Sequence, residues 1–286
     1  MPRLAEIEAH IATMDGLRDV VGALRSLAGM RLQDAQRALT AARAYADEVA
    51  TALGTAVHTL PELRLAAPDP VGRRAVVLCM SEHGFVGDFN TRLASFAQAQ
   101  LRDTDDLLLL GSRGVAAAAA HGIRPIWTLP LATRTANATH TALALADELY
   151  RRAARGDITR IDLIYAVGGT IGQTTVRQRT LMPLDLRSLA SAPARTAPLH
   201  NLAPPRLIEL LTSEYVFALL TEATLESVGG ENAARFAAMD AAHSNVSRKL
   251  EGLRHSAREV RQSEITSELL DVVTGAEAMS TDSVRN

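Results

Sequence analysis

The sequence predicts an α/β chain with a long antiparallel coiled coil: helices at both ends form a shaft, and a central Rossmann-like α/β domain lies at its base. Proline breaks helix interiors, and it is absent between Pro2 and Pro61 and again after Pro205. Apolar residues recur at three- and four-residue intervals in both proline-free ends, as they do in coiled coils. Between them, apolar runs alternate with helical segments, which indicates a largely parallel sheet. The predicted domains are 1–60, 61–205 and 206–286.

The N-terminal helix is predicted over 3–58. Its apolar stripe consists of Leu4, Ile7, Ile11, Met14, Leu17, Val21, Leu24, Ala28, Leu32, Ala35, Leu39 and Ala42. The step from Met14 through Leu17 to Val21 offsets the phase, which resembles a coiled-coil stammer. Gly16, Gly22 and Gly29 each lower helix propensity by up to about 1 kcal/mol relative to alanine. This helix therefore needs another element to pack against.

The C-terminal helix is predicted over 206–282 and has the more regular pattern. Its stripe consists of Phe236, Met239, His243, Val246, Leu250, Leu253, Ala257 and Val260. Apolar residues resume in a shifted phase from Ile265 to Met279. At about 1.5 Å per residue, such a helix is on the order of 110 Å long, so we expect much of it to project from any compact domain.

The central segment supplies the expected sheet. Buried strands are predicted at 75–80, 107–110 and 161–167. Asn90 is a candidate N-cap for a helix that starts at Thr91, and Gly122 a candidate end for a helix that starts near Val115. The Pro- and Ala-rich segment 193–205 is predicted to be a linker.

Composition and charge exclude several function classes. The chain has 30 basic and 32 acidic residues, whereas a general nucleic-acid binder has a basic excess. No apolar stretch approaches the roughly 18–20 residues that cross a bilayer, so we expect a soluble chain or one held at a membrane by partners. The single cysteine, Cys79, excludes an internal disulfide and a zinc site of several thiolates, and it fits a reducing compartment.

Nucleotide binding through a phosphate loop is not expected either. Such a loop needs a lysine on a Gly-rich turn, and the single lysine, Lys249, lies in the C-terminal helical pattern. The most similar stretch, 168–175, has Gln173 in place of that lysine and the wrong glycine spacing. We therefore predict no bound cofactor, no metal and no catalytic residue.

Three further candidates have simpler structural explanations. Cys79 and His83 could form a nucleophile and its base, but a lone cysteine in an apolar strand is far more often a core residue. The turn 84–90 could cradle a phosphate, but it lacks dinucleotide spacing and any lysine, so we interpret it as a strand-to-helix connection. His243 is interpreted as a packed or partner-facing residue.

Several motifs resemble one family in chain order. Residues 265–278, Ile-Thr-Ser-Glu-Leu-Leu-Asp-Val-Val-Thr-Gly-Ala-Glu-Ala, match the signature near the C-terminus of F-type ATP synthase gamma subunits at every specified position. Residues 239–242 and 261–262 also match the residues that are usual at these places in that family. The turns 84–90 and 111–114 resemble its Gly-Leu-Cys-Gly-Gly-x-Asn and Gly-Ser-(Lys/Arg)-Gly turns. The chain thus resembles a gamma subunit over essentially its whole length.

Departures from the family suggest a divergent branch. The family usually carries lysines in the third and fourth turns of its first helix, where this chain has Asp19 and Gly22. The turn 84–90 has lost the cysteine and gained Asp88. These differences concern individual coupling contacts and leave the assignment of the whole chain unchanged.

The resemblance implies the function of a central rotor shaft. In such a complex, ion flow turns the membrane-embedded c-ring together with the shaft, and the shaft biases the catalytic alpha–beta sites toward different states. The implied partners are the alpha and beta subunits, the epsilon subunit and the c-ring. The implied location is the cytoplasmic face of the bacterial inner membrane, with membrane contact only through the c-ring. Two alternatives remain: a Rossmann-like enzyme with helical dimerisation arms, and a coiled-coil scaffold unrelated to ATP synthesis.

The resemblance also implies three contact regions on the C-terminal helix. Arg261, Gln262 and Thr266 would bind a loop of a beta subunit, although spacing alone indicates a solvated polar face. A basic stretch would face the acidic lever of the beta subunits, although ordinary surface charge also explains it: Arg248, Lys249, Arg254 and Arg258. A hydrophobic bearing would surround the last turns, part of which coiled-coil packing also explains: Leu269, Leu270, Val272, Val273, Ala276 and Met279.

Overall fold

The computed structural model describes residues 2–59, 72–168, 174–184, 189 and 200–283, with side chains described over the same ranges except at 2–3, 58–59 and 275–283. The chain divides into two compact units. One contains Met1–Arg25 and Met239–Asn286, and the other contains Ser26–Ala238. Helices α1 (Pro2–Thr59) and α6 (Pro204–Ser283) each contribute to both units. The two long terminal helices that the sequence predicts are confirmed.

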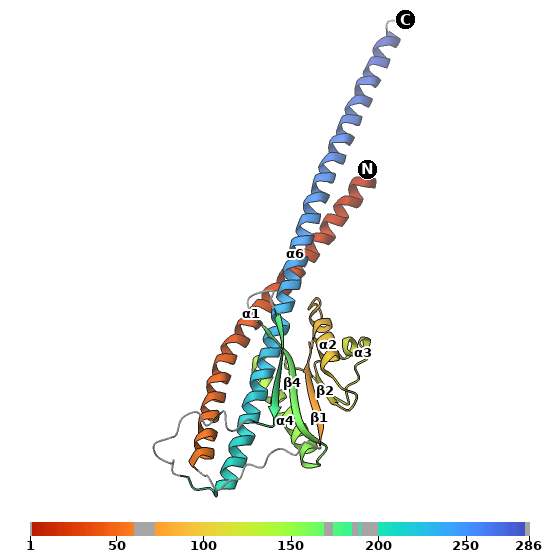
Figure 1. Cartoon of the computed structure of the whole chain (residues 1–286). Coiled ribbons are helices and arrows are strands. Elements are labelled where there is room, and N and C mark those ends of the chain that lie inside the picture. The colour runs from red at the N-terminus through yellow and green to blue at the C-terminus, as the bar shows by residue number, and fades with distance from the viewer. Residues whose placement is uncertain (1, 60–71, 169–173, 185–188, 190–199, 284–286) are drawn as a thin grey trace. The chain divides into compact units, whose positions relative to one another are not determined.

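The unit Ser26–Ala238 is built on a five-stranded sheet of order β3-β2-β1-β4-β5 (Figure 1). Its strands are β1 (Arg73–Cys79), β2 (Asp106–Leu110), β3 (Trp127–Leu129), β4 (Ile158–Gly168) and β5 (Thr174–Met182). The first four strands in this order pair in parallel, and β5 pairs antiparallel with β4. The largely parallel sheet that the sequence predicts is therefore present, with an antiparallel edge strand that was not predicted.

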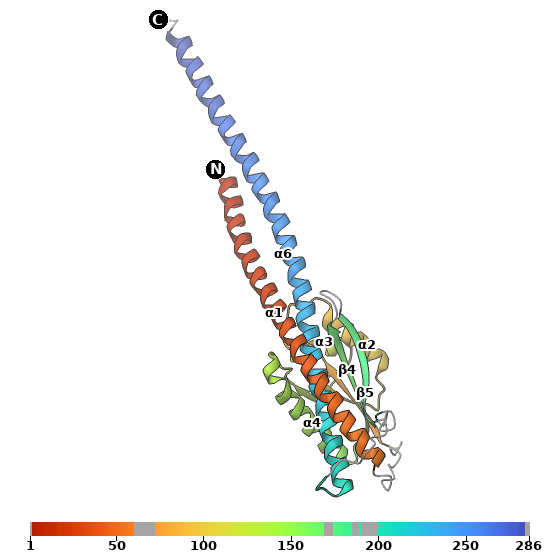
Figure 2. The same cartoon turned by 90° about the vertical axis from the view of Figure 1, so that its left-hand side faces the viewer.

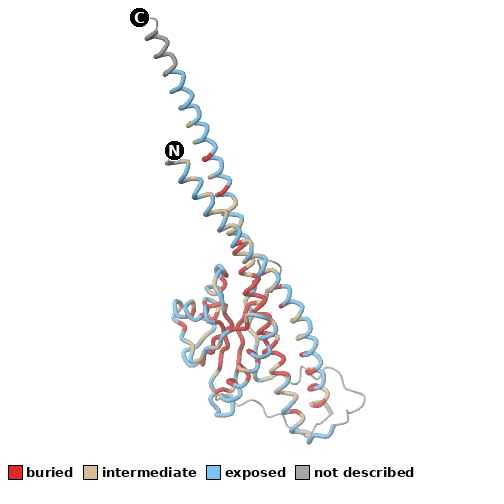
Figure 3. Tube along the Cα trace, turned by 180° about the vertical axis from the view of Figure 1, so that it is seen from behind, coloured by how far each residue is buried: buried red, intermediate tan, exposed pale blue. Residues whose placement is uncertain are grey.

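Side chains that alternate along the central strands build a core on each face of the sheet. Ala75 and Val77 of β1 belong to one core cluster, and Val76 and Leu78 belong to the other. Helices α2 (Phe89–Gln100) and α3 (Gly114–Ala120) supply the second cluster. The first cluster is covered by α4 (Ala138–Ala154) together with parts of α1 and α6 (Figures 1 and 2). Figure 3 shows the buried residues concentrated in these layers.

Helix α6 packs closely on β4. A Cβ atom on Gly230 would lie 2.6 Å from the Ala166 carbonyl oxygen, whereas one on Gly229 would lie 3.6 Å from the Ala35 side chain. Real Cβ atoms do not approach within 3.0 Å of another atom, so Gly230 sets the distance between helix and strand. This packing explains why glycine occurs inside a long helix, where it costs helix propensity.

Charged side chains connect α6 to α1 and β5 within the same unit. Arg43 Nε lies 3.1 Å from Glu222 Oε1 and also pairs with Glu226, whose side chain is 1% exposed. Arg179 Nη1 of β5 lies 2.8 Å from Glu222 Oε2. Removing Arg43 would leave the buried Glu226 carboxylate without this cation, which is destabilising even though the arginine itself is half exposed. These pairs therefore connect both helices and the sheet.

The unit Met1–Arg25 with Met239–Asn286 is an antiparallel helix pair. Three ion pairs link its helices: Arg25–Asp240 at 2.8 Å, Asp15–Arg254 at 3.0 Å and Glu8–Arg261 at 2.6 Å. As the residue number falls along α1, the number of its partner rises along α6, which defines the antiparallel direction. The predicted α6 stripe is buried or half-buried from Met239 to Val260.

The phase offset predicted in α1 is wrong. Leu17 is 44% exposed. Arg18 and Arg25 are half-buried and continue the three- and four-residue spacing without interruption from Leu4 to Val21 and on to Ala28. Both arginines pair with aspartates at the edge of the contact between α1 and α6, which we call the seam. Arg18 pairs with Asp15 at 3.1 Å, and Arg25 pairs with Asp240. Long arginine stems can cover apolar surface while the guanidinium stays hydrated, so a polar residue occupies a seam position here.

The predicted cap at Asn90 is also wrong. Helix α2 begins at Phe89, one residue before Asn90. The Asn90 side chain instead accepts a hydrogen bond from the Ser81 backbone N–H at 3.0 Å and donates one to Ser81 Oγ at 2.7 Å. Asn90 therefore fixes the end of β1. The predicted end at Gly122 is close to the observed one, because α3 ends at Ala120 and Gly122 has φ +72°.

Two sequence interpretations fall partly on residues outside those described. These are the stretch 168–175, which was compared with a phosphate loop, and the predicted linker 193–205. None of the helices in the described ranges contains an apolar stretch that could span a lipid bilayer. Within the same described part of the chain, no cluster of three or more His, Cys, Asp or Glu side chains could hold a metal ion.

Candidate functional site

The predicted contact residues Arg261, Gln262 and Thr266 lie on α6 in the helix-pair unit, and all three are exposed. Arg261 Nη2 donates to Glu8 Oε1 at 2.6 Å across the pair. The Thr266 hydroxyl donates to the Gln262 carbonyl oxygen at 2.8 Å, one turn back along its own helix. The structure thus gives Arg261 a carboxylate on α1, which the sequence interpretation missed. The only sequence feature that could have indicated this ion pair is the presence of an acidic residue, Glu8, in the first helix.

The four cations of the predicted basic stretch are all exposed on α6. Arg254 pairs with Asp15 of α1, and Arg248 donates to Asn245 on its own helix. Lys249 and Arg258 lie on turns whose buried positions are Leu250 and Ala257. The cations therefore surround the seam and leave its apolar stripe intact. Positive charge at this surface remains available for an acidic partner.

Beyond the paired region, α6 exposes large apolar side chains. The exposed fractions are 52% for Ile265, 61% for Leu269, 61% for Leu270, 69% for Val272 and 53% for Val273. At about 100° per residue, these positions spread over about 160° of the helix surface. Figures 1 and 2 show that α6 continues past the N-terminus of α1. Ala276 and Met279 lie further along α6, and their side chains are outside those described.

An exposed apolar surface of this kind indicates an interaction site. A helix that packs on one side has an apolar stripe about 100° wide, and the surface from Ile265 to Val273 is wider than that. It therefore suits a partner that encloses the helix more than a second helix on one side.

The carboxyl edge of the sheet, where a Rossmann-like enzyme would bind its ligand, is filled by carboxylates of this chain. Glu82 Oε2 accepts hydrogen bonds from the backbone N–H groups of Ser112 and Leu131, both at 2.9 Å. Glu231 accepts from the N–H groups of Glu82 at 3.0 Å and His83 at 3.1 Å. The loops after β1, β2 and β3 are thereby fixed to one another and to α6. The sequence interpretation missed these two glutamates, because no local motif indicates that two distant segments meet.

Close packing fills the same edge. A Cβ on Gly111 would lie 2.4 Å from the Met80 carbonyl oxygen, and one on Gly114 would lie 2.2 Å from Met80 Cβ. The end of β1 therefore packs directly against the two glycines of the Gly-Ser-Arg-Gly turn, and it occupies the space that a phosphate would need. The turn 84–90 connects β1 to α2, as the sequence predicts, with positive φ at Phe85 and Gly87.

Cys79 is a core residue. It is 3% exposed, and burial raises the pKa of its thiol to about 11, an effect that a hydrogen bond with Ser227 opposes. A thiol that stays protonated at neutral pH is a poor nucleophile. The imidazole Nδ1 of His83 lies 3.9 Å from Glu231 Oε1. His243 is half-buried, and its ring packs at Gly22, where an added Cβ would lie 3.7 Å from the ring.

The ATP synthase family model matches residues 3–279 of this chain. The chain belongs to the ATP synthase gamma-chain family. The ATP synthase gamma chain of Prosthecochloris aestuarii is 28% identical over 98% of this chain and 99% of its own length. That of Streptomyces avermitilis is 28% identical over 97% and 96%. The resemblance inferred from the motifs is thereby confirmed, and neither alternative class is favoured.

Solved structures show the same fold at low identity. A chain of the Euglena gracilis mitochondrial ATP synthase, from a structure of OSCP, F1 and c-ring in rotational state 3, aligns with a TM-score of 0.65 and 13% identity over 97% of this chain and 95% of that one. A chain from the Tetrahymena thermophila central stalk and c-ring aligns with a TM-score of 0.58 and 18% identity over 78% and 99%. These chains therefore share the fold described above.

Proposed function

We propose that this chain is the central rotor of an F-type ATP synthase: it couples ion-driven rotation of a c-ring to conformational change at alpha–beta catalytic sites, without catalysing a reaction itself. The observation that carries the proposal is the exposed apolar surface of α6 from Ile265 to Val273 in a chain of this family. Such a surface needs an enclosing partner, as a ring of alpha and beta subunits would provide.

The proposal extends to three contact regions on α6 and to the partners of the central segment. Within the rotor we assign Arg261, Gln262 and Thr266 to a beta-subunit loop, and Leu269, Leu270, Val272, Val273, Ala276 and Met279 to the bearing. The basic stretch Arg248, Lys249, Arg254 and Arg258 would face acidic segments of the beta subunits, where charge complementarity orients the contact. The epsilon subunit and the c-ring would bind the part of the chain within 61–205, with 1–60 and 206–286 acting as the shaft.

The mechanism requires no reactive side chain. Each rotor angle presents a different set of side chains to a given catalytic site, so each angle stabilises a different conformation of that site. A rotor shifts such an equilibrium only as far as its contacts differ between the site's conformations. The side chains of α1 and α6 differ around the helix pair, with ion pairs at Glu8, Asp15 and Arg25. The helix pair therefore has the asymmetry that this coupling needs.

The first test is recovery of the complex. An affinity-tagged copy of the chain, purified from its own cells in mild detergent, should bring down alpha and beta subunits together with ATPase activity. The epsilon subunit and the c-ring should accompany them, and the isolated chain should have no ATPase activity. A stable chain recovered without alpha and beta subunits would count against the rotor function.

The second test separates a partner contact from a contact within the chain. Arg261→Ala removes both the proposed beta contact and the ion pair with Glu8, whereas Glu8→Ala removes only the ion pair. We expect Arg261→Ala and Gln262→Ala to lower ATP-driven ion pumping per ATP hydrolysed in membrane vesicles, and Glu8→Ala to leave this ratio unchanged. Equal losses in Arg261→Ala and Glu8→Ala would assign the effect to the helix pair and refute the beta contact.

A further inference from the structure

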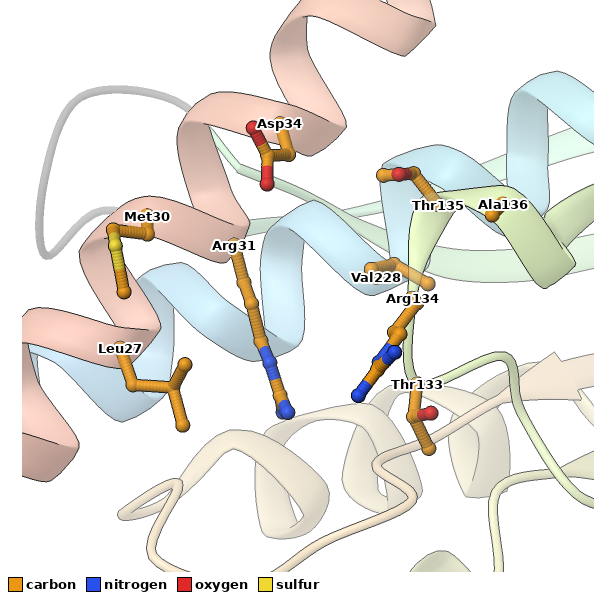
Figure 4. A pocket seen from close by; sticks show the side chains of 9 residues that line it. All are labelled: Leu27, Met30, Arg31, Asp34, Thr133, Arg134, Thr135, Ala136 and Val228. Atoms are coloured by element: carbon orange, nitrogen blue, oxygen red, sulfur yellow. The ribbon is translucent and has the colours of Figure 1, made fainter.

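A cavity of about 370 Å³ lies between α1 and the loop that leads from β3 into the short helix η1 (Thr135–Asn137), all within the unit Ser26–Ala238. Small-molecule sites commonly have volumes of about 300–1,000 Å³, so the cavity can hold a small ligand. Figure 4 shows the side chains that line it. None of the three contact regions assigned on α6 includes them, although α1 belongs to the proposed shaft and 133–136 to the segment proposed to bind the epsilon subunit and the c-ring.

Two arginines from different elements point into this cavity. Arg31 comes from α1 and Arg134 from the loop before η1, and Figure 4 shows their guanidinium groups directed to the same space. Among the ion pairs of the described residues, none includes Arg31 or Arg134. A guanidinium keeps its charge at any physiological pH, so two like charges face one cavity. A bound anion would replace this repulsion with attraction.

The remaining lining suits an anion that carries an organic group. The hydroxyl-bearing side chains of Thr133 and Thr135 line the cavity together with the arginines. Leu27 and Met30, which are 39% and 57% exposed, form an apolar wall on the α1 side. Guanidinium groups bind phosphate oxygens in pairs of parallel hydrogen bonds, and threonine hydroxyls can donate to the remaining oxygens.

One carboxylate also lines the cavity and opposes an anion. Asp34 lies one turn after Arg31 on α1, and its Oδ1 is 3.5 Å from Arg37 Nη1. The Arg37 cation, 75% exposed, offsets part of the charge of Asp34. The balance at the cavity is therefore positive, with two unpaired arginines against one paired aspartate.

We propose that this cavity binds a phosphate-bearing small molecule, with Arg31 and Arg134 holding the phosphate groups and Leu27 and Met30 contacting its organic part. The site lies outside the three contact regions assigned on α6. A ligand there would connect α1 to the loop after β3.

Calorimetric titration of the purified full-length chain with pyrophosphate and with ADP tests the site. We expect saturable binding with one ligand per chain. Because hydrogen bonds to charged groups are strong, Arg31→Gln and Arg134→Gln should each weaken binding about ten-fold or more. Asp34→Asn should strengthen it several-fold, because it removes the opposing charge. We expect ADP to bind more tightly than pyrophosphate, because the apolar wall contacts the nucleoside, and equal binding would refute the proposed contact with Leu27 and Met30.

Arg37→Gln is the matched control, because it removes the same charge from the same helix outside the cavity, and it should not abolish binding. Circular dichroism of each variant checks its folding. Absence of saturable binding of both probes to the wild type would overturn the proposal, as would equal losses in Arg37→Gln and Arg31→Gln. Displacement of pyrophosphate by a glutamate-rich peptide of equal charge at lower concentration would also overturn it, because the surface would then select an acidic protein segment.

Discussion

At the scale of single residues, glycine determines how closely α6 approaches the sheet. Gly229 and Gly230 are adjacent in the same helix but have different surroundings, because Gly230 faces the Ala166 carbonyl and Gly229 faces Ala35. The two positions therefore separate the effect of packing from the effect of helix propensity.

We predict opposite effects of alanine at these two positions. Gly230→Ala should lower the free energy of unfolding by about 1–3 kcal/mol, because the added methyl group overpacks the contact with β4. Gly229→Ala should raise it by up to about 1 kcal/mol, since alanine favours helix and the space is available. Urea unfolding followed by circular dichroism measures both. A destabilised Gly229→Ala variant together with a neutral Gly230→Ala variant would contradict the packing of α6 on β4.

Cys79 provides a second prediction, on pH dependence. Burial raises the pKa of its thiol from 9.0 to about 11. The unfolded chain therefore releases this proton at lower pH than the folded chain, so the contribution of Cys79 to stability is complete below pH 9 and is lost as the pH rises toward 11. Burial also raises the pKa of Tyr165, to about 12, and acts in the same direction.

Alkylation measures the state of the thiol directly. At pH 8, iodoacetamide should modify Cys79 slowly in the folded chain and rapidly in urea, because the thiolate is the reactive form and the side chain is buried. Cys79→Ala should show no alkylation, which controls for reaction at other groups. Equal rates in the folded and unfolded chains would show that the thiol is accessible and unperturbed.

At the scale of secondary-structure elements, the sequence predicts a helix and its buried face correctly where the apolar periodicity extends over several heptads. The α6 stripe from Met239 to Val260 spans several heptads, so one polar member, His243, does not obscure it. In α1, Leu17 is apolar and exposed while Arg18 is polar and half-buried. Hydrophobicity alone therefore predicted the wrong phase over one turn.

Short or polar strands could not be predicted in the same way. Strand β3 has three residues, and β5, Thr-Thr-Val-Arg-Gln-Arg-Thr-Leu-Met, carries three long polar side chains in its centre. Both lie at sheet edges, where one side of the strand has no neighbouring strand and polar residues are tolerated. Helix α4 has a clear apolar face, with Leu145 and Leu149 buried, but was not predicted.

The seam of the helix pair provides the third prediction. Leu250 is 1% exposed, so Leu250→Ala should destabilise the pair by about 2–5 kcal/mol through lost burial and the cavity left behind. Glu251→Ala, at an exposed neighbouring position, is the control and should have little effect. Hydrogen exchange should accelerate in 2–25 and 239–264 of the Leu250→Ala variant, with the sheet strands unchanged. Unchanged exchange in these ranges would place Leu250 outside the seam.

At the scale of the whole molecule, the two units differ in how much apolar surface they bury. Among the described residues, the buried apolar side chains of the helix-pair unit are Val21, Met239, Leu250 and Ala257, whereas both core clusters belong to Ser26–Ala238. A unit with so few buried side chains has little to offset the conformational entropy of folding.

We therefore predict that a fragment of residues 26–238 unfolds cooperatively on its own. Peptides of residues 1–25 and 239–286, when mixed, should be much less helical than the same segments in the intact chain. Circular dichroism during heating compares the fragment, the mixed peptides and the whole chain. Cooperative melting of the peptides alone, or a fragment that lacks a transition, would contradict this division of stability.

The contact residues illustrate what a sequence can and cannot provide. The motif at 265–278, which was recognised because its order of residues resembles one family, includes the exposed apolar residues from Ile265 to Val273. No pattern indicated that Arg261 would meet Glu8, or that Glu82 and Glu231 would hold three loops together, because these contacts depend on how segments about 30 to 250 residues apart come together. Local periodicity carries no information on such distances.

The single lysine has a practical consequence. Lys249 is exposed on α6 beside the buried Leu250, and no other side chain of the sequence carries a primary amine. An amine-reactive dye or bead linker used above neutral pH would therefore attach at one defined side chain of the helix pair, apart from the chain's amino terminus. The native sequence thus already contains a selective labelling point from which the orientation of this helix could be followed in a single molecule.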